Sequence, residues 1–279
     1  MKPTGENQKT RIVIVLKRQI TLITDFGTRD YYVPTLIGQI KSVNPLVEIH
    51  HLTHSIARQN IVEAAFTLRN SYPYFPEETI HIIIVDPEVG SDRDAVAVKH
   101  DGHFFVAPDN GILTLALQTT RPEKIISVRN SRYSSRNISP VFHGRDVFVP
   151  VAAWLSKGVS IDLLGAEKDE LTDLRWGLPS WDKQKIIGQV IHIDHFGNLI
   201  TNISERFLEH WAGDSAYHIG LAGWDPLPLS TIYSDVEPGD PVALIGSGGL
   251  LELAVYQADA AQLFDVKIGS QIMVEKEKK

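Results

Sequence analysis

The chain has 279 residues, with 34 acidic and 27 basic side chains and a formal net charge of −7. An acidic chain without a stripe of lysine and arginine is poorly suited to phosphate contacts, so no nucleic-acid partner is expected. The chain contains no cysteine, which excludes disulfides, thiolate catalysis and cysteine-ligated metal centres. No apolar run approaches the roughly 18 residues of a membrane-spanning helix, and no secretory signal is evident, so we expect a cytoplasmic protein with no membrane partner.

Strands and helices alternate in the first part of the chain. Residues 1–18 are expected to be a disordered tail. The hydrophobic pattern predicts strands at 19–26, 46–53, 79–87 and 124–128, helices at 31–43, 60–72, 111–118 and 144–158, and a hairpin with Asp101 and Gly102 at its turn. This alternation predicts an α/β N-terminal domain, residues 19–160, with a mainly parallel sheet.

The character of the chain changes after residue 160. Residues 161–185 are polar and rich in turn formers, which predicts a linker. From 186 to 279 the apolar runs are short and strand-like, and turns such as 237–241 separate them. This pattern predicts a smaller all-β, barrel-like C-terminal domain.

Acidic residues follow two of the predicted strands. Asp25 and Asp30 lie in "TDFGTRD", and Asp86 with Arg93 lies in "VDPEVGSDRD". Ligands of parallel sheets bind outside the carboxyl ends of the strands, where a carboxylate can hold a sugar diol. Structural alternatives stay open, because Asp30 can cap the next helix and Asp86 with Arg93 can be a buried ion pair.

His143 is a candidate for such a ligand site, because it follows Pro140 in a segment whose side chains are expected to point into the crevice. It directly precedes the helix predicted at 144–158, although a core histidine is the simpler explanation for this residue alone. His50, His51 and His54 lack the spacing of a metal-binding motif. No metal site is therefore predicted.

Two segments of the C-terminal half carry groups suited to binding a ligand. "IDHFGNLITNI" contains Asp194, the ring of Phe196 and the amide of Asn198, which can read a base edge, although a hairpin turn explains the same spacing. In "GSGGLLELAV" the glycines around Ser247 can bring backbone N–H groups to a carboxylate. The segment matches neither a phosphate-binding loop nor a dinucleotide fingerprint.

Five segments occur in order: "ITLITDFGTRDYYV", "IIIVDPEVGSDR", "FHGRDVF", "DHFGNLITNI" and "GSGGLLELAV". Together they resemble the S-adenosyl-L-methionine hydroxide adenosyltransferases, adenosine-forming hydrolases related to fluorinases and chlorinases. The resemblance covers residues 19–275. It implies an α/β domain joined to a β-barrel domain, S-adenosyl-L-methionine as substrate, no cofactor, and a homotrimer with the substrate between subunits.

The resemblance also implies roles for individual residues. It implies a hydrolase triad of Asp86, Arg93 and His143. The substrate-binding residues that it implies are Asp25 for the ribose diol, Asp30 and Asp194 for the methionine ammonium group, Phe196 and Asn198 for adenine, and Ser247 near the methionine carboxylate.

Two positions near the implied triad affect the expected chemistry. Gly144 stands where halogenating relatives have a serine, which favours water over halide as the nucleophile. Glu88 replaces a glycine usual in the family, and we expect its side chain to point to solvent.

Other functions stay open from the sequence. A halogenase would use chloride or fluoride on the same substrate. A non-catalytic protein that binds adenosine or S-adenosyl-L-methionine would result if Glu88 disabled the triad. A metal-dependent phosphohydrolase would use the loops rich in aspartate and histidine.

Overall fold

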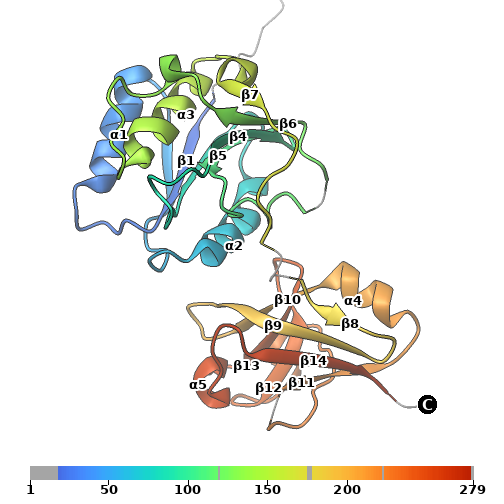
Figure 1. Cartoon of the computed structure of the whole chain (residues 1–279). Helices are drawn as coiled ribbons and strands as arrows, with labels where there is room; N and C mark the ends of the chain where they lie inside the picture. Colours follow the sequence, from blue (N-terminus) through green and yellow to red (C-terminus); the bar gives the residue numbers. More distant parts are fainter. Residues whose placement is uncertain (1–17, 119, 175–177, 222, 278–279) are drawn as a thin grey trace, which may run out of the picture. The chain divides into compact units, whose positions relative to one another are not determined.

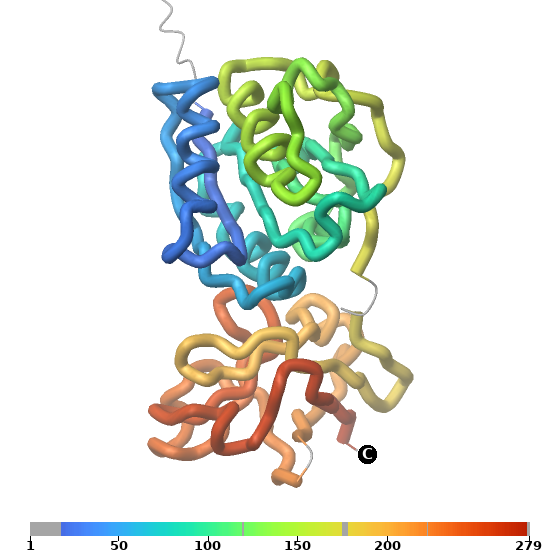
Figure 2. The backbone as a smooth tube through the Cα atoms, turned by 60° about the vertical axis from the view of Figure 1, so that its left-hand side comes forward, coloured from blue at the N-terminus to red at the C-terminus, as the bar shows by residue number. Residues whose placement is uncertain are grey.

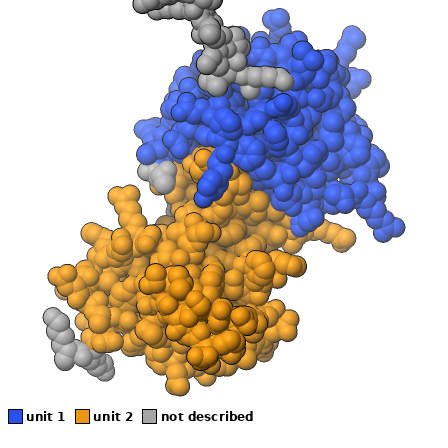
Figure 3. All heavy atoms as spheres, turned by 180° about the vertical axis from the view of Figure 1, so that it is seen from behind, with its two compact units in different colours: residues 1–55, 74–108, 120–170 blue, residues 56–73, 109–119, 171–279 orange. Residues whose placement is uncertain are grey.

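The computed structural model describes residues 18–118, 120–174, 178–221 and 223–277 (Figure 1). The predicted tail lies outside these residues except for Arg18, which donates hydrogen bonds to the Glu78 carboxylate and the carbonyl oxygen of Leu155. The chain forms two compact units, one of residues 1–55, 74–108 and 120–170, the other of residues 56–73, 109–119 and 171–279 (Figure 3). The predicted domain boundaries stay a prediction.

The first unit is built on a seven-stranded sheet with the order β2-β1-β3-β5-β4-β6-β7. Its strands are β1 (Ile20–Thr24), β2 (Ile49–Thr53), β3 (Ile80–Ile84), β4 (Ala95–His100), β5 (His103–Pro108), β6 (Lys124–Val128) and β7 (Gly165–Glu167). The pairs from β2 to β5 are parallel, and the pairs from β5 to β7 are antiparallel. The sheet is thus mixed rather than mainly parallel, because the predicted hairpin at Asp101 and Gly102, both at positive φ, reverses the chain between β4 and β5.

Helices α1 (Tyr32–Val43) and α3 (Val149–Ser156) pack together on one face of this sheet (Figures 1 and 2). Leu36 and Ile40, four residues apart on α1, are fully buried in a core with Leu22 of β1 and Ile82 of β3. The burial of each such side chain contributes about 1.5–3 kcal/mol. This core holds β1 and β3 side by side, which matters because the candidate site follows these two strands.

The helix predicted at 111–118 is wrong. The described residues of this segment form consecutive turns, with hydrogen bonds from Thr114 N–H to Gly111 O and from Ala116 N–H to Leu113 O. Gly111 has φ +90°, which a right-handed helix cannot accommodate. The apolar periodicity of the segment reflects burial of its side chains and not a helix.

The second unit contains an antiparallel sheet with the order β11-β14-β9-β10-β13-β12, and β8 pairs with β9. Its strands are β8 (Ser180–Trp181), β9 (Lys185–Ile193), β10 (Leu199–Ser204), β11 (Tyr217–Leu221), β12 (Pro241–Ile245), β13 (Leu250–Val255) and β14 (Gln271–Lys276). The short antiparallel strands confirm the predicted barrel-like character of this part of the chain.

Helices also occur in the second unit, which is therefore not purely β. Helix α4 (Glu205–Ala212) is capped by the Ser204 hydroxyl, and α5 (Ala260–Phe264) by the Asp259 carboxylate. Both helices are too short to display a clear period in the sequence. No helix among the described residues is long and apolar enough to cross a membrane.

Helix α2 (Ile61–Ser71) belongs to the second unit. Its Val62 and Phe66 pack on a cluster of buried residues in the antiparallel sheet, which comprises Ile191, Ile200 and Leu250. The Phe66 ring also stacks on His192, with 4.4 Å between ring centroids. These contacts pack the first half of α2 on the strands of this unit.

A buried histidine of the first unit predicts acid sensitivity. His81 has no exposed surface, and burial, together with nearby His103, lowers its pKa to about 3. The unfolded chain therefore binds a proton below pH 6.5 that the folded chain does not bind, and the free energy of unfolding falls as the pH falls through this window. Between pH 6.5 and pH 5 the loss should be about 2 kcal/mol. His81→Gln should reduce this dependence by about that amount in urea unfolding at several pH values, whereas a variant of exposed His210, His210→Gln, should keep it. An unchanged slope in His81→Gln would contradict the prediction.

Candidate active site

The candidate site lies at the carboxyl ends of β1 and β3. These strands are parallel neighbours, and Thr24 at the end of β1 pairs with Ile84 at the end of β3. From β1 the chain leads to β2 on one side, and β3 lies on the other side. Asp25 and Asp86 therefore follow the two strands at a topological switch point, where open α/β sheets bind their ligands.

Three side chains distant in the sequence meet in this unit. Arg93 Nε donates to Asp86 Oδ1 at 2.8 Å, and Arg93 Nη2 donates to Asp86 Oδ2. The same Nη2 lies 3.1 Å from His143 Nδ1. The side chains of Arg93 and Asp86 are each only 6% exposed. The structure thus brings together the three residues of the implied triad, while their catalytic roles stay a prediction.

The protonation state of His143 follows from its partner. A guanidinium can only donate hydrogen bonds, so Nδ1 of His143 accepts and the neutral imidazole carries its proton on Nε2. Burial, reinforced by the positive charge of Arg93, lowers the pKa of His143 below its usual value. At neutral pH the ring is therefore uncharged, and its Nε2–H is a hydrogen-bond donor.

His143 is positioned by a π-helical turn, Gly144–Phe148, that precedes α3. Pro150 has no N–H to donate to the carbonyl oxygen of Asp146, as an α-helix would require. That oxygen accepts instead from Ser135 N–H at 2.7 Å, and Val149 N–H donates to Gly144 O. The helix predicted at 144–158 is present, but it begins with this wider turn, a feature often found at functional sites.

Asp146, which the sequence analysis did not single out, holds this turn. It is 3% exposed, and its Oδ2 accepts from Ser139 N–H at 2.9 Å. Arg145 donates to both carboxylate oxygens at 2.8 Å. Burial opposes ionisation of Asp146, but the hydrogen bonds from Arg145 and Ser139 outweigh it and lower the pKa of Asp146. Its place in "FHGRD", next to the histidine, was the signal that could have identified it.

His54, which the sequence analysis considered only as a metal ligand, has a structural role beside Asp25. Its Nδ1 lies 2.9 Å from the Thr24 hydroxyl, and its carbonyl oxygen accepts from Gly27 N–H at 2.7 Å. Its Nε2 lies 2.6 Å from His51 Nδ1. His54 thus ties the end of β2 to the loop that carries Asp25.

The other residues expected near the triad take simple positions. Asp25 is half-buried and Asp30 is exposed. The N-cap residue of α1 is Tyr31, which makes no side-chain cap hydrogen bond, so Asp30 does not cap that helix. Glu88 is exposed, as expected. Asp94 follows Arg93 in the sequence, and its carboxylate accepts from the Ser127 hydroxyl at 2.7 Å and from Lys168 Nζ at 3.0 Å.

The C-terminal candidates share one turn and one loop of the second unit. Asp194 Oδ1 accepts from the N–H groups of Phe196 and Asn198, both at 2.9 Å, and its Oδ2 accepts from Asn198 Nδ2 at 2.9 Å. Gly197 has φ +85°, so the turn that the sequence left as an alternative is present. Phe196 is 74% exposed, and Ser247 is exposed in the turn after β12.

Two protein-family models together match almost the whole chain. The model of the SAM hydroxide adenosyltransferase N-terminal domain matches residues 20–165, and the model of the C-terminal domain matches residues 188–273. The chain belongs to the SAM hydroxide adenosyltransferase family.

Several known proteins are similar to the chain over nearly their whole length. The (R)-S-adenosyl-L-methionine hydrolases of Methanocaldococcus jannaschii and Thermus thermophilus are each 32% identical, over 91% of this chain and 95% and 98% of those proteins. A fluorinase of Actinopolyspora mzabensis is 26% identical over 91% of the chain and 96% of its own length. The crystal structure of an uncharacterized conserved protein from Thermotoga maritima has a TM-score of 0.83 and 32% identity, over 92% of this chain and 99% of that one.

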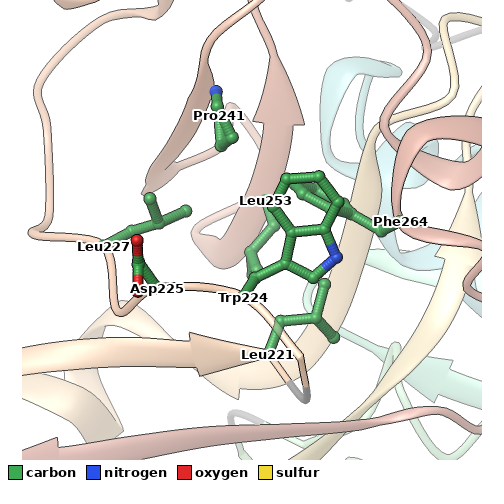
Figure 4. A pocket seen from close by; sticks show the side chains of 7 residues that line it. All are labelled: Leu221, Trp224, Asp225, Leu227, Pro241, Leu253 and Phe264. Atoms are coloured by element: carbon green, nitrogen blue, oxygen red, sulfur yellow. The ribbon is translucent and has the colours of Figure 1, made fainter.

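A cavity in the second unit is separate from these candidates. It has a volume of about 260 Å³ and is lined by Leu221, Trp224, Asp225, Leu227, Pro241, Leu253 and Phe264 (Figure 4). None of the predicted site residues is in its lining. Among the described residues, no group of three histidine, cysteine, aspartate or glutamate side chains is placed to hold a metal ion.

The role of Asp146 in this SAM hydroxide adenosyltransferase can be tested by its removal. Asp146→Ala should lower the free energy of unfolding by about 2–3 kcal/mol, because a buried charged acceptor is lost and the Ser139 N–H is left unpaired. Urea unfolding monitored by tryptophan fluorescence measures this change. Asp162→Ala, which removes an exposed carboxylate 3.1 Å from Lys124, should change stability little. Equal effects of the two substitutions would exclude a special role for Asp146.

Proposed function

We propose that the chain hydrolyses S-adenosyl-L-methionine to adenosine and L-methionine, by attack of water at C5′ of the substrate. The observation that carries the proposal is the connected cluster of Asp86, Arg93 and His143 at the switch point of the first sheet. Family membership and the similarity to proteins named as (R)-S-adenosyl-L-methionine hydrolases support it.

The substrate dictates what the protein must supply. Its sulfonium departs as neutral methionine, so the leaving group needs little help from an acid. Water, in contrast, is a poor nucleophile and must lose a proton. The protein therefore has to place a water molecule in line with the C5′–S bond and accept its proton.

Asp86 is suited to this task in spite of its ion pair. Arg93 donates to both of its oxygens, which fixes the carboxylate in orientation, and each oxygen retains further acceptor capacity. The acidity of the water rises as its oxygen bonds to C5′, so a carboxylate is a sufficient base late in the step. General-base assistance of this kind contributes about 10²–10⁴-fold.

His143 would help to position the attacking water through a hydrogen bond. Its Nδ1 is occupied by Arg93, and its Nε2–H donates to no acceptor among the residues that the structure describes. In the proposal this N–H donates to the attacking oxygen and, after the step, to the 5′-hydroxyl of adenosine. The neutral state that burial imposes on the ring is the state with a single, directed donor.

The proposal extends to the residues that bind the substrate. Asp25 would accept the ribose diol, Asp30 and Asp194 the methionine ammonium group, and Ser247 would lie near the methionine carboxylate. Phe196 would stack on adenine, and Asn198 would bind its edge with Oδ1 and the second hydrogen of Nδ2, since the first donates to Asp194. The proposal also includes a homotrimer and involves no cofactor or metal.

A halide nucleophile is less well supported. Gly144 provides no hydroxyl beside His143, although a β-carbon at this position would meet only Ile84 and Phe142 side chains at 3.4 Å. The fluorinases compared are 26–27% identical to the chain, against 32% for two of the hydrolases.

Incubation with S-adenosyl-L-methionine should release adenosine and L-methionine in equal amounts, as measured by liquid chromatography. Asp86→Ala should lower the turnover at least about 100-fold, because the base is lost, while substrate still binds. Glu88→Gln, at an exposed position beside the site, should retain activity. In ¹⁸O-labelled water the label should enter the 5′-hydroxyl of adenosine. Label in methionine, or full activity of Asp86→Ala, would contradict the mechanism.

The pH dependence of the reaction should reflect His143. Its pKa lies below 6.5, so the ring takes up a second proton, and Arg93 loses its acceptor, only in acid. We expect kcat/KM to be level from pH 6.5 to 8 and to decline below that range. In His143→Gln, whose amide keeps a donor and an acceptor, the decline should disappear at a reduced rate. An acid limb centred at or above pH 7 in the unaltered protein would argue against a neutral His143.

A further inference from the structure

Arg69, in the last turn of α2, is a cation without an anionic partner. Its Nη1 donates to the carbonyl oxygen of Gly248 at 2.8 Å and to Asn70 Oδ1 at 3.0 Å. No carboxylate pairs with it among the residues that the structure describes. The side chain is half-buried, and burial lowers its pKa, with only nearby Tyr72 opposing the shift. A partly desolvated charge without a counter-ion is costly, which suggests that its partner is a ligand.

The unused edge of the guanidinium has a definite chemistry. Both hydrogen bonds of Arg69 to the described residues use Nη1, so Nε and Nη2 are left to donate side by side. Two parallel N–H groups in this fork match the two oxygens of a carboxylate. The edge is therefore better suited to a carboxylate than to a single carbonyl oxygen.

The glycine turn beside Arg69 offers further donors. Gly246 N–H donates to Leu250 O and Gly249 N–H to Gly246 O, both at 2.9 Å, which closes the turn. The N–H groups of Ser247 and Gly248 donate to no acceptor within the described part of the chain. Successive unpaired N–H groups of this kind form a concavity for anions.

The absence of a side chain at Gly248 makes the approach of Arg69 possible. A β-carbon at this position would lie 2.6 Å from Asn70 Oδ1 and 3.6 Å from Arg69 Nη1. A larger residue would displace the Asn70 amide, whose oxygen accepts from Arg69 Nη1. Glycine thus places the cation of α2 against the turn that carries Ser247, and all these groups belong to the second unit.

We infer that Arg69 is a specificity-determining residue that binds the α-carboxylate of the substrate, together with the N–H groups of Ser247 and Gly248. The inference rests on the proposed function, since it assigns one end of S-adenosyl-L-methionine to this turn. The inference adds that the protein discriminates between a substrate with an α-carboxylate and one that carries only the amine. A substrate without the carboxylate leaves the Arg69 guanidinium unpaired.

The test compares two substrates in matched variants. In Arg69→Gln, kcat/KM for S-adenosyl-L-methionine should fall about 10- to 100-fold, through KM, with kcat changed less than about threefold. For decarboxylated S-adenosylmethionine, which lacks the carboxylate, the variant and the unaltered protein should have the same kcat/KM. Arg69→Lys should give an intermediate result, because an ammonium keeps the charge but lacks the fork. Arg206→Gln, at an exposed position of α4, is the control and should behave as the unaltered protein.

Two outcomes would overturn the inference. An equal loss for both substrates in Arg69→Gln and Arg69→Lys would show that Arg69 only supports the turn at Gly248. No loss for either substrate would show that it does not meet the ligand. If the unaltered protein releases no adenosine, the proposed function fails, and calorimetry with L-methionine and with 3-(methylthio)propylamine still tests Arg69: only binding of the amino acid should depend on it.

Discussion

The guanidinium of Arg93 is the group on which the candidate site depends, because it donates to both oxygens of Asp86 and to Nδ1 of His143. One planar cation thereby sets the orientation of the carboxylate and the tautomer of the imidazole. Without it, Asp86 would be a buried carboxylate with no counter-charge and His143 would be free to present either nitrogen. The fork geometry of arginine, which lysine lacks, is what allows one side chain to orient two others.

Two features of the scaffold hold this arrangement in place. The parallel pair β1 and β3 brings Asp25 and Asp86 to one edge of the sheet, and the packing of α1 and α3 keeps these strands buried. The wide turn before α3 then presents His143. That turn exists because Pro150 cannot donate a helical hydrogen bond, and buried Asp146 ties its start to the preceding loop.

In the second unit, the candidate polar groups lie in turns rather than at the ends of parallel strands. Asp194 uses both of its oxygens to fold the turn of Phe196 and Asn198, so the same carboxylate serves the structure and is available to a cationic ligand at its edge. In the turn at 246–249, the missing side chain of Gly248 leaves room for the Asn70 amide, which accepts from Arg69. In the proposed function, the first unit supplies the triad together with Asp25 and Asp30. The second unit supplies the other groups that bind the adenine and methionine parts of the substrate.

The sequence by itself determined most of the strands and helices, since β-branched runs, glycine turns and the spacing of apolar residues are local signals. Strands β7 and β8 lie in the segment that was predicted to be a linker. It also determined which polar residues follow β1 and β3. The mixed sheet, the turns at 111–118 and the short helices α4 and α5 were decided only by the tertiary structure, because strand direction and burial depend on distant partners. The same holds for the contacts of His54 and Arg69. Their partners Thr24 and Gly248 lie 30 and 179 residues away in the sequence, and only folding brings such groups to hydrogen-bond distance.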